Sequence, residues 1–204
     1  MKKRDISISL NIVLIIFEIM GCLVLYNEIH RLGIEYYTEE SNLLALVVAI
    51  IYVVYLLLKK KIPKWLSILK YMANIHLAVT FLVVIFILAP LDNYAYYTYL
   101  MTGTMLYHHL LCPVVSLISF IFFDDVGLLE DRDLPVSLSL TWTYAAIMII
   151  LNIAGTIIGP YPFLRVKEQT ILASIIWFVL VLGFIYLIAY YLKAIYNNKH
   201  KLRR

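Results

Sequence analysis

Long uninterrupted apolar segments are the dominant feature of this 204-residue chain. A helix needs about 20 apolar residues to cross the hydrocarbon core of a bilayer, which is about 30 Å thick. The apolar residues here are continuous, whereas the strands of a membrane β-barrel alternate apolar and polar positions. The sequence therefore predicts an all-α, polytopic integral membrane protein with six transmembrane helices. We expect these helices at residues 6–26, 38–58, 68–89, 104–123, 138–158 and 170–192.

The composition excludes the main soluble classes of protein. Hydrophobic residues make up 63% of the chain and charged residues 15%, whereas soluble domains average about 45–50% and 25%. A disordered chain would need low hydrophobicity and high charge, and a net charge of only +4 argues against a nucleic-acid-binding protein. No internal repeat or interdomain linker is visible. Residues 1–204 are therefore expected to form a single six-helix transmembrane domain.

The basic residues predict the orientation of the chain. If the N-terminus lies inside, three of the 17 basic residues, Arg31, Arg165 and Lys167, lie outside. Because short cytoplasmic loops are enriched in Lys and Arg, both termini are expected in the cytoplasm. The acidic loop from Asp124 to Asp133 is also expected inside, where we interpret it as a solvated connector. The basic residues expected on the inner side are Lys2, Lys3, Arg4, Lys59, Lys60, Lys61, Lys64, Lys70, Arg132, Lys193, Lys199, Lys201, Arg203 and Arg204.

Ionisable residues within the predicted spans are the first candidates for a functional site, because they are costly to bury in a membrane. Thr38, Ser41 and Asn42 are spaced i, i+3 and i+4, so they share one helical face. Only 16 uninterrupted apolar residues follow Asn42, which span about 24 Å, so this face is expected near the outer boundary. The ionisable candidates are Glu18, Glu39, Glu40, His76, His108 and His109.

The pair His108 and His109 is expected about one turn below the same outer boundary. The two side chains are adjacent and point in different directions, so they would not easily share one metal ion. His76 is expected near the opposite face, where a hydrogen-bonded structural role is favoured and a haem shared with the pair is excluded by distance. With a metal site and a haem set aside, the remaining chemistry is that of a hydroxyl nucleophile activated by a neighbouring imidazole. Thr38 is thus a candidate nucleophile, with His108 or His109 as its base, and no metal or organic cofactor is expected.

Four short motifs resemble those of the six-span androgen-induced protein family. YYTEESNLL (36–44) resembles its aromatic-Thr motif, and KYMANIHLAVTFLVV (70–84) is similar to the third span of bacterial relatives. YHHLLCP (107–113) resembles the segment in which a catalytic His precedes a Pro, and YPFL (161–164) matches the segment after the fifth span. Animal members of the family hydrolyse fatty acid esters of hydroxy fatty acids with a membrane-embedded Thr and His.

The resemblance implies a lipid ester hydrolase in a plasma membrane of bacterial type. Thr38 would be its nucleophile; the spacing in animal members corresponds to His108 and that in bacterial members to His109. Ser41, Asn42 and Tyr161 are candidate donors to the oxyanion. The expected partners are membrane lipids and a lipid ester substrate, whose acyl chains would lie in an apolar groove between helices.

The alternative is a non-enzymatic membrane protein for lipid or small-molecule binding, transport or assembly. In that case the same polar cluster would be a binding site. Glu18 and the pair Glu39–Glu40 would then support a proton-linked or cation-linked role.

Overall fold

The computed structural model describes residues 3–202, and within them every regular element is helical. The predicted inner-side residues Lys2, Arg203 and Arg204 lie outside the described residues. In this part of the chain, five helices are long and apolar enough to cross a membrane, judged by length and composition. They are Lys3–Ile29, Tyr37–Leu57, Lys64–Leu91, Gly103–Phe123 and Ile171–Lys201. The all-helical prediction is confirmed, and each of these helices coincides with a predicted span.

Two of these five long helices consist of consecutive shorter elements. The first two are the single helices α1 (Lys3–Ile29) and α2 (Tyr37–Leu57), and the last is α10 (Ile171–Lys201). The third and fourth contain π-helical turns, in which the helix is locally widened. The third long helix comprises α3 (Lys64–Val83), η1 (Val84–Leu88) and α4 (Ala89–Leu91). The fourth comprises α6 (Gly103–Met105), η2 (Leu106–Leu111), α7 (Cys112–Ile118) and η3 (Ser119–Phe123). The short helix α5 (Tyr96–Met101) lies between them.

The predicted span at 138–158 is a shorter helix in the structure. It corresponds to α9 (Ser139–Ala154), which has 16 residues and follows the short helix α8 (Asp133–Ser137). At about 1.5 Å per residue, α9 covers about 24 Å. The helix ends early because Gly155 adopts a left-handed conformation, with φ of 79°, which caps its C-terminus.

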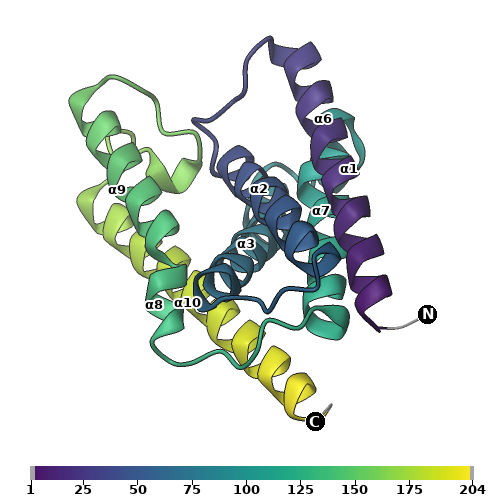
Figure 1. Ribbon diagram of the computed structural model, residues 1–204. Coiled ribbons are helices and arrows are strands. Elements are labelled where there is room, and N and C mark those ends of the chain that lie inside the picture. Colours follow the sequence, from purple (N-terminus) through teal and green to yellow (C-terminus); the bar gives the residue numbers. More distant parts are fainter. Residues whose placement is uncertain (1–2, 203–204) are drawn as a thin grey trace.

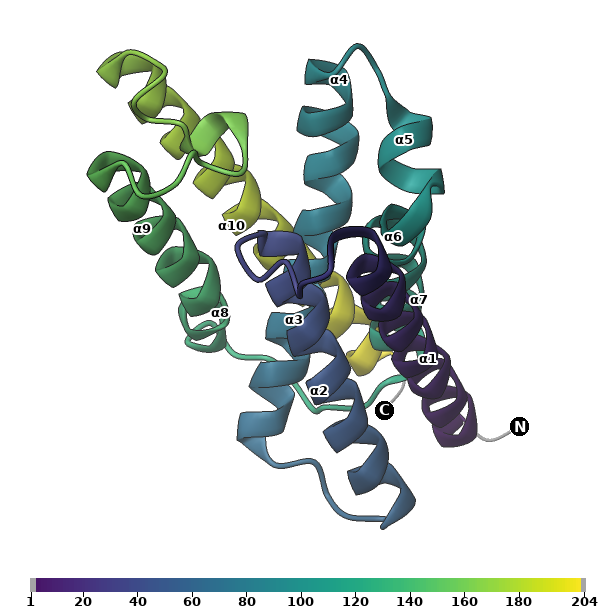
Figure 2. The ribbon, with the colours of Figure 1, turned by 90° about the horizontal axis from the view of Figure 1, so that it is seen from above.

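The helices are arranged around α3, the most buried of the long helices. α1, α2 and α7 lie on one side of the molecule, and α9 and α10 lie on the other (Figures 1 and 2). The loop after α9 contains the 3₁₀ turn η4 (Pro162–Leu164), and it returns toward the first turn of α2.

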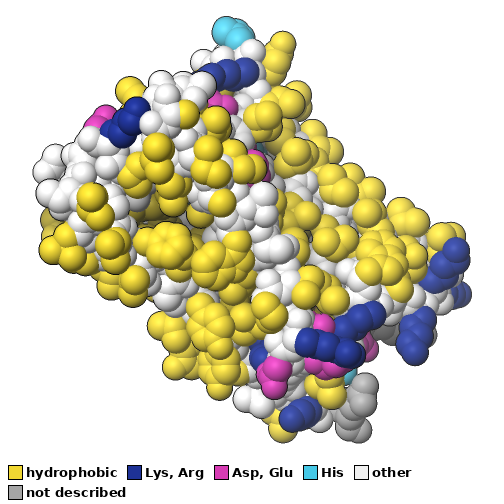
Figure 3. Space-filling model, turned by 90° about the vertical axis from the view of Figure 1, so that its left-hand side faces the viewer, with side chains coloured by type: hydrophobic (Ala, Val, Ile, Leu, Met, Phe, Trp, Pro, Cys, Tyr) yellow, Lys and Arg dark blue, Asp and Glu magenta, His cyan; other side chains and the backbone are white. Residues whose placement is uncertain are grey.

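The outer surface of the helices is strongly apolar. Ile150 is 64% exposed, and Ile171 and Leu172 are 82% and 67% exposed. Figure 3 shows hydrophobic side chains over most of the face formed by α9 and α10, with Lys and Arg near its edges. Continuous apolar patches of this size are disfavoured in water. The structure is therefore compatible with a multi-pass membrane protein.

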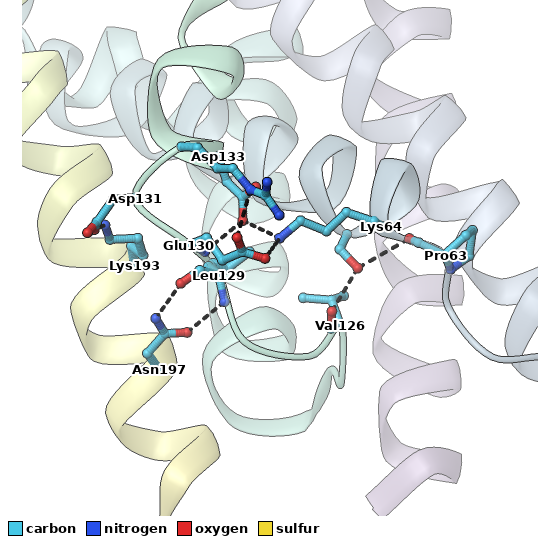
Figure 4. Close-up of polar contacts among 11 residues, drawn as sticks. Pro63, Lys64, Val126, Leu129, Glu130, Asp131, Asp133, Lys193 and Asn197 are labelled. Carbon is cyan, nitrogen blue, oxygen red and sulfur yellow. Dashed lines mark hydrogen bonds and ion pairs between the residues drawn. The ribbon is translucent and has the colours of Figure 1, made fainter.

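The acidic loop before α8 is anchored to two helices. Lys64 Nζ of α3 donates to Asp133 Oδ2 at 2.6 Å and to Glu130 Oε1 at 3.1 Å. Asn197 of α10 donates to the Leu129 carbonyl at 2.8 Å and accepts from its N–H at 3.0 Å (Figure 4). The interpretation of this loop as a solvated connector is thus wrong in part, because its side chains and backbone make specific contacts that hold α3, α8 and α10 together.

The first residue of this loop, Asp124, is fully buried against α1 and α3. Its Oδ1 accepts hydrogen bonds from Ser7 at 2.6 Å, Asn11 at 3.0 Å and Ser119 at 2.8 Å. Its Oδ2 lies 3.4 Å from Nζ of Lys70, which is also buried. A buried ion pair is tolerated only when further hydrogen bonds satisfy its charges. This cluster therefore joins α1, α3 and η3 at the end of the bundle opposite to Thr38.

Candidate functional site

The first turn of α2 carries the predicted polar face. Thr38 is 8% exposed, and Ser41 and Asn42 are fully buried. The shared helical face predicted from their spacing is therefore confirmed, and it points into the protein. The helix begins at Tyr37, immediately after the extended residue Tyr36.

The two adjacent histidines lie in the π-helical turn η2, and both are buried. Their side chains contact different partners. His109 Nε2 lies 3.3 Å from Thr38 Oγ1, whereas His108 points toward two carboxylates on α1 and α2. Of the two histidines that the sequence left open, His109 is the one that the structure places beside Thr38. π-Helical turns are frequent at functional sites.

The proton on the His109 ring is positioned by a backbone carbonyl. Nδ1 of His109 lies 2.9 Å from the carbonyl oxygen of Tyr99. A carbonyl can only accept, so Nδ1 must carry the proton, and in the neutral ring Nε2 then has a free lone pair. That lone pair faces the Thr38 hydroxyl. This is the tautomer and orientation that a general base for Thr38 requires.

Tyr161 provides a second polar group beside Thr38. Its hydroxyl oxygen lies 3.5 Å from Thr38 Oγ1 and accepts from the Thr38 N–H at 3.4 Å. The ring is held by stacking on Phe163, with centroids 5.3 Å apart. Burial raises the pKa of Tyr161 to about 12, so the phenol keeps its proton and can donate it in a hydrogen bond.

Ser41 and Asn42 donate their side-chain hydrogen bonds to the backbone. Ser41 Oγ donates to the Tyr37 carbonyl at 2.6 Å, and Asn42 Nδ2 donates to the Thr38 carbonyl at 2.8 Å. Such i−4 bonds are common for Ser in helices. Of the three predicted oxyanion donors, the structure thus brings Tyr161 to the Thr38 hydroxyl and directs Ser41 and Asn42 to backbone carbonyls.

His108 joins the two turns that carry Thr38 and His109. Its Nδ1 lies 2.9 Å from Oε2 of Glu39, the residue after Thr38. Its Nε2 lies 3.9 Å from Oε2 of Glu18, which is fully buried on α1. Because Glu39 neighbours Thr38 and His108 neighbours His109, this contact restrains the distance between the hydroxyl and the imidazole.

His76 does not lie near the opposite face as expected, because its ring stacks on that of Tyr37, the residue before Thr38, with centroids 5.5 Å apart. Its hydrogen bonds are those of a buried network, consistent with the structural role expected for it. Nδ1 of His76 donates to the Met72 carbonyl at 2.7 Å, so Nε2 accepts from Thr141 at 3.1 Å. The Thr141 hydroxyl in turn accepts from Tyr37 at 2.9 Å. Sequence reasoning missed Thr141, and it also missed the Tyr99 carbonyl, which acts through the backbone and leaves no side-chain signal.

Two cavities meet at Thr38. The first, which we call the apolar cavity, has a volume of about 480 Å³ and lies between α3, α9 and α10. The second, the charged cavity, has a volume of about 410 Å³ and is bordered by the C-terminal end of α1 and by α5. Thr38, Leu88 and Tyr161 line both cavities. Thr38 therefore borders two cavities whose linings differ in chemistry.

Among residues 3–202, no group of three or more His, Cys, Asp or Glu side chains is placed to hold a metal ion. No family model, curated protein or solved structure matches this chain. Thr38, His109 and Tyr161 themselves define the chemistry that this site can support.

Gly21 of α1 makes room for the His108 ring, which gives a test of this packing. A Cβ atom on Gly21 would lie 2.2 Å from His108 Nε2. Gly to Ala in a helix interior usually stabilises by about 0.5–1 kcal/mol. We expect Gly21→Ala instead to lower the free energy of unfolding by about 1–3 kcal/mol, the usual cost of overpacking. Unfolding of the detergent-purified variants measures this change.

Gly183→Ala is the matched control, because Gly183 lies within α10 and its added Cβ would meet nothing within 4 Å. This variant should be at least as stable as the wild type. Equal stability of the two alanine variants would contradict the described packing of His108 against α1.

Proposed function

We propose that this chain is a membrane-embedded hydrolase of fatty acyl esters, with Thr38 as nucleophile and His109 as base. One observation carries the proposal. The Thr38 hydroxyl lies 3.3 Å from His109 Nε2, while the Tyr99 carbonyl holds the proton on Nδ1. A contact of 3.3 Å is long for a hydrogen bond, but hydrogen bonds at active sites often tighten only when substrate is bound.

The first half of the reaction forms an acyl-enzyme. As Thr38 Oγ1 attacks the ester carbonyl carbon, its proton passes to His109 Nε2. The carbonyl oxygen becomes an oxyanion, which the Tyr161 hydroxyl is placed to stabilise as a donor. When the tetrahedral intermediate collapses, the bond to the alcohol oxygen breaks, and His109 returns its proton to that oxygen.

The second half of the reaction releases the fatty acid. A water molecule gives a proton to His109 Nε2 as its oxygen attacks the acyl carbon. Collapse of this second intermediate breaks the bond to Thr38 Oγ1, which takes the proton back from His109. The Thr38 hydroxyl and the neutral imidazole are thereby restored, and no other reactant is consumed.

The apolar cavity and the sequence resemblance both support an acyl substrate. Aliphatic and aromatic side chains of α3, α9 and α10 form most of the lining of the apolar cavity, and pockets of about 300–1,000 Å³ are typical for small-molecule ligands. The motifs at 36–44 and 161–164, which resemble the androgen-induced protein family, supply Thr38 and Tyr161. The third functional residue, His109, is the histidine that corresponds to the bacterial spacing.

The second candidate function is that of a non-enzymatic binding or transport protein, and it is favoured by Glu18. This carboxylate is fully buried, 3.9 Å from His108 Nε2, and takes no part in the hydrolytic scheme. Buried carboxylates within membrane spans often bind protons or cations. Transport or binding activity of the wild type in the absence of any ester hydrolysis would favour this function.

Substitution of the reacting groups tests the hydrolase directly. We expect Thr38→Ala to abolish hydrolysis of lipid esters, and His109→Ala to lower kcat by about 10²–10⁴-fold because it removes the general base. Tyr161→Phe removes one oxyanion donor and should lower kcat by about 10²–10³-fold. His108→Ala should reduce thermal stability more than activity. The rates are measured on detergent-purified variants at a temperature at which each variant is folded, and thermal stability is measured alongside.

Thr156→Ala, at an exposed position beyond α9, is the control and should retain wild-type activity. Full activity in Thr38→Ala would remove the nucleophile from the scheme.

We also propose that the chain crosses the membrane six times, with both termini in the cytoplasm. α8 is attached through Asp133 to Lys64, at the start of α3. The loop after α9 reaches Thr38, near the start of α2. α2 and α3 run in opposite directions, because they are consecutive and pack along each other. α9 therefore connects the two ends of the bundle, although it has only 16 residues.

Single cysteines at Asp92 and Lys199, introduced after Cys22 and Cys112 are replaced by serine, test this topology. A membrane-impermeant thiol reagent applied to intact cells should label the cysteine at position 92 but not the one at position 199. Labelling at both positions would show that α9 does not cross. Labelling at position 199 alone would show that the orientation is inverted.

A further inference from the structure

We infer that the substrate ester is divided between the two cavities, with a single alkyl chain in the apolar cavity and a zwitterionic head group in the charged cavity. The substrate class would then be an acyl ester of an alcohol that carries both a phosphate and an ammonium group. This inference rests on the proposed hydrolase function and specifies its substrate.

The position of Thr38 requires such a division. Thr38 and Tyr161 line both cavities, and Leu88 is the third residue that they share. An ester carbonyl within reach of Thr38 Oγ1 and the Tyr161 hydroxyl would therefore lie at the junction. Since a carboxylic ester has one substituent on each side of its reacting carbonyl, one arm would extend into each cavity.

The position of His109 decides which arm enters which cavity. His109 lines the charged cavity and not the apolar one. The proton on its Nε2 must be delivered to the oxygen of the leaving alcohol, so the alcohol arm lies on the side of the charged cavity. The acyl chain therefore lies in the apolar cavity.

The lining of the charged cavity indicates the chemistry of the alcohol. It contains acidic groups, Glu28, Glu39 and Asp92, together with basic groups, Arg31 and Arg165. A second alkyl chain would desolvate these charges without replacing their hydrogen bonds. Guanidinium groups bind phosphate well, and carboxylates with nearby aromatic rings such as Tyr36 suit an ammonium group.

Arg31 and Glu28 are both exposed and available for such a ligand, whereas the Arg165 side chain already donates to the Gly159 carbonyl. The Arg31 side chain is 63% exposed, and its ion pair with Glu35, at 2.7 Å, is a surface pair that is exchanged at little cost. The Glu28 carboxylate lies directly over Gly103, where an added Cβ would come within 2.0 Å of Oε1. Gly103 has a positive φ of 46°, so the backbone at this point is also adapted to glycine.

A panel of four palmitoyl esters tests the head-group assignment on the purified full-length protein. The panel is a choline lysophospholipid, a glycerol lysophospholipid, a monoacylglycerol and a palmitoyl ester of a hydroxy fatty acid. We expect kcat/KM for the choline lipid to exceed the other values at least tenfold. Equal values, or a preference for the ester with two alkyl arms, would overturn the inference.

Three variants test the acidic and the basic groups of the charged cavity separately. Glu28→Gln should lower kcat/KM about tenfold for the choline lipid alone, whereas Arg31→Gln should lower it for both phosphate-bearing lipids. Lys61→Gln, at an exposed position in the loop between α2 and α3, is the control and should change kcat/KM for neither lipid. Failure of both cavity variants to alter the preference would contradict a role for the charged cavity.

Ala145→Phe tests the other arm, because Ala145 lines the apolar cavity. The larger side chain should shift the preferred acyl chain from palmitoyl to a shorter one and leave the head-group preference unchanged. A change in head-group preference with no change in chain length would show that the two arms are assigned the wrong way round.

Binding of an ether analogue separates this inference from the proposed function. The probe is hexadecyl glycerophosphocholine, which has no ester to hydrolyse, bound to Thr38→Ala. If the wild type hydrolyses no ester but Glu28→Gln weakens this binding about tenfold, the hydrolase fails and the divided site stands. If all four esters are hydrolysed equally and Glu28→Gln leaves binding unchanged, the hydrolase stands and the divided site fails.

Discussion

The free-energy cost of burying polar groups in an apolar interior restrains how the helices pack at both ends of this protein. At the end opposite to Thr38, Asp124 is satisfied by three hydroxyl or amide donors and by Lys70, and these contacts join α1, α3 and η3. At the other end, His108 is paired with Glu39. A buried charge that lost its partner would cost several kcal/mol, so these pairs restrain how the helices pack.

The candidate site depends on this restraint. Thr38 and His109 come from different long helices and touch at a single long contact. The neighbouring pair Glu39 and His108 makes a shorter contact, 2.9 Å. The Glu39–His108 pair therefore holds Thr38 and His109 in position. In the proposed scheme, His108 fixes the geometry and His109 transfers the proton.

Much of the fold follows from the sequence, because apolar segments of about 20 residues have few alternatives to a helix in a membrane. The spacing of Thr38, Ser41 and Asn42 correctly predicted that they share one helical face, because helical periodicity is local; the burial of this face comes from the packing. The early end of α9 was not predicted, because it depends on the left-handed conformation of Gly155. The acidic loop was interpreted as solvated, because its basic partners are distant in sequence. The choice of His109 over His108 needed the packing of α2 against η2, and the positioning carbonyl of Tyr99 carries no side-chain signal. The chemical roles of Thr38 and His109 stay predictions.

Covalent trapping of the nucleophile tests the central claim most directly. The purified protein is incubated with a long-chain fluorophosphonate, digested, and analysed by mass spectrometry to locate the phosphonylated residue. The account predicts one adduct on Thr38, formed in the wild type and in His108→Gln at comparable rates and strongly slowed in His109→Gln. An adduct on another residue, or labelling of Thr38 that does not depend on His109, would contradict it.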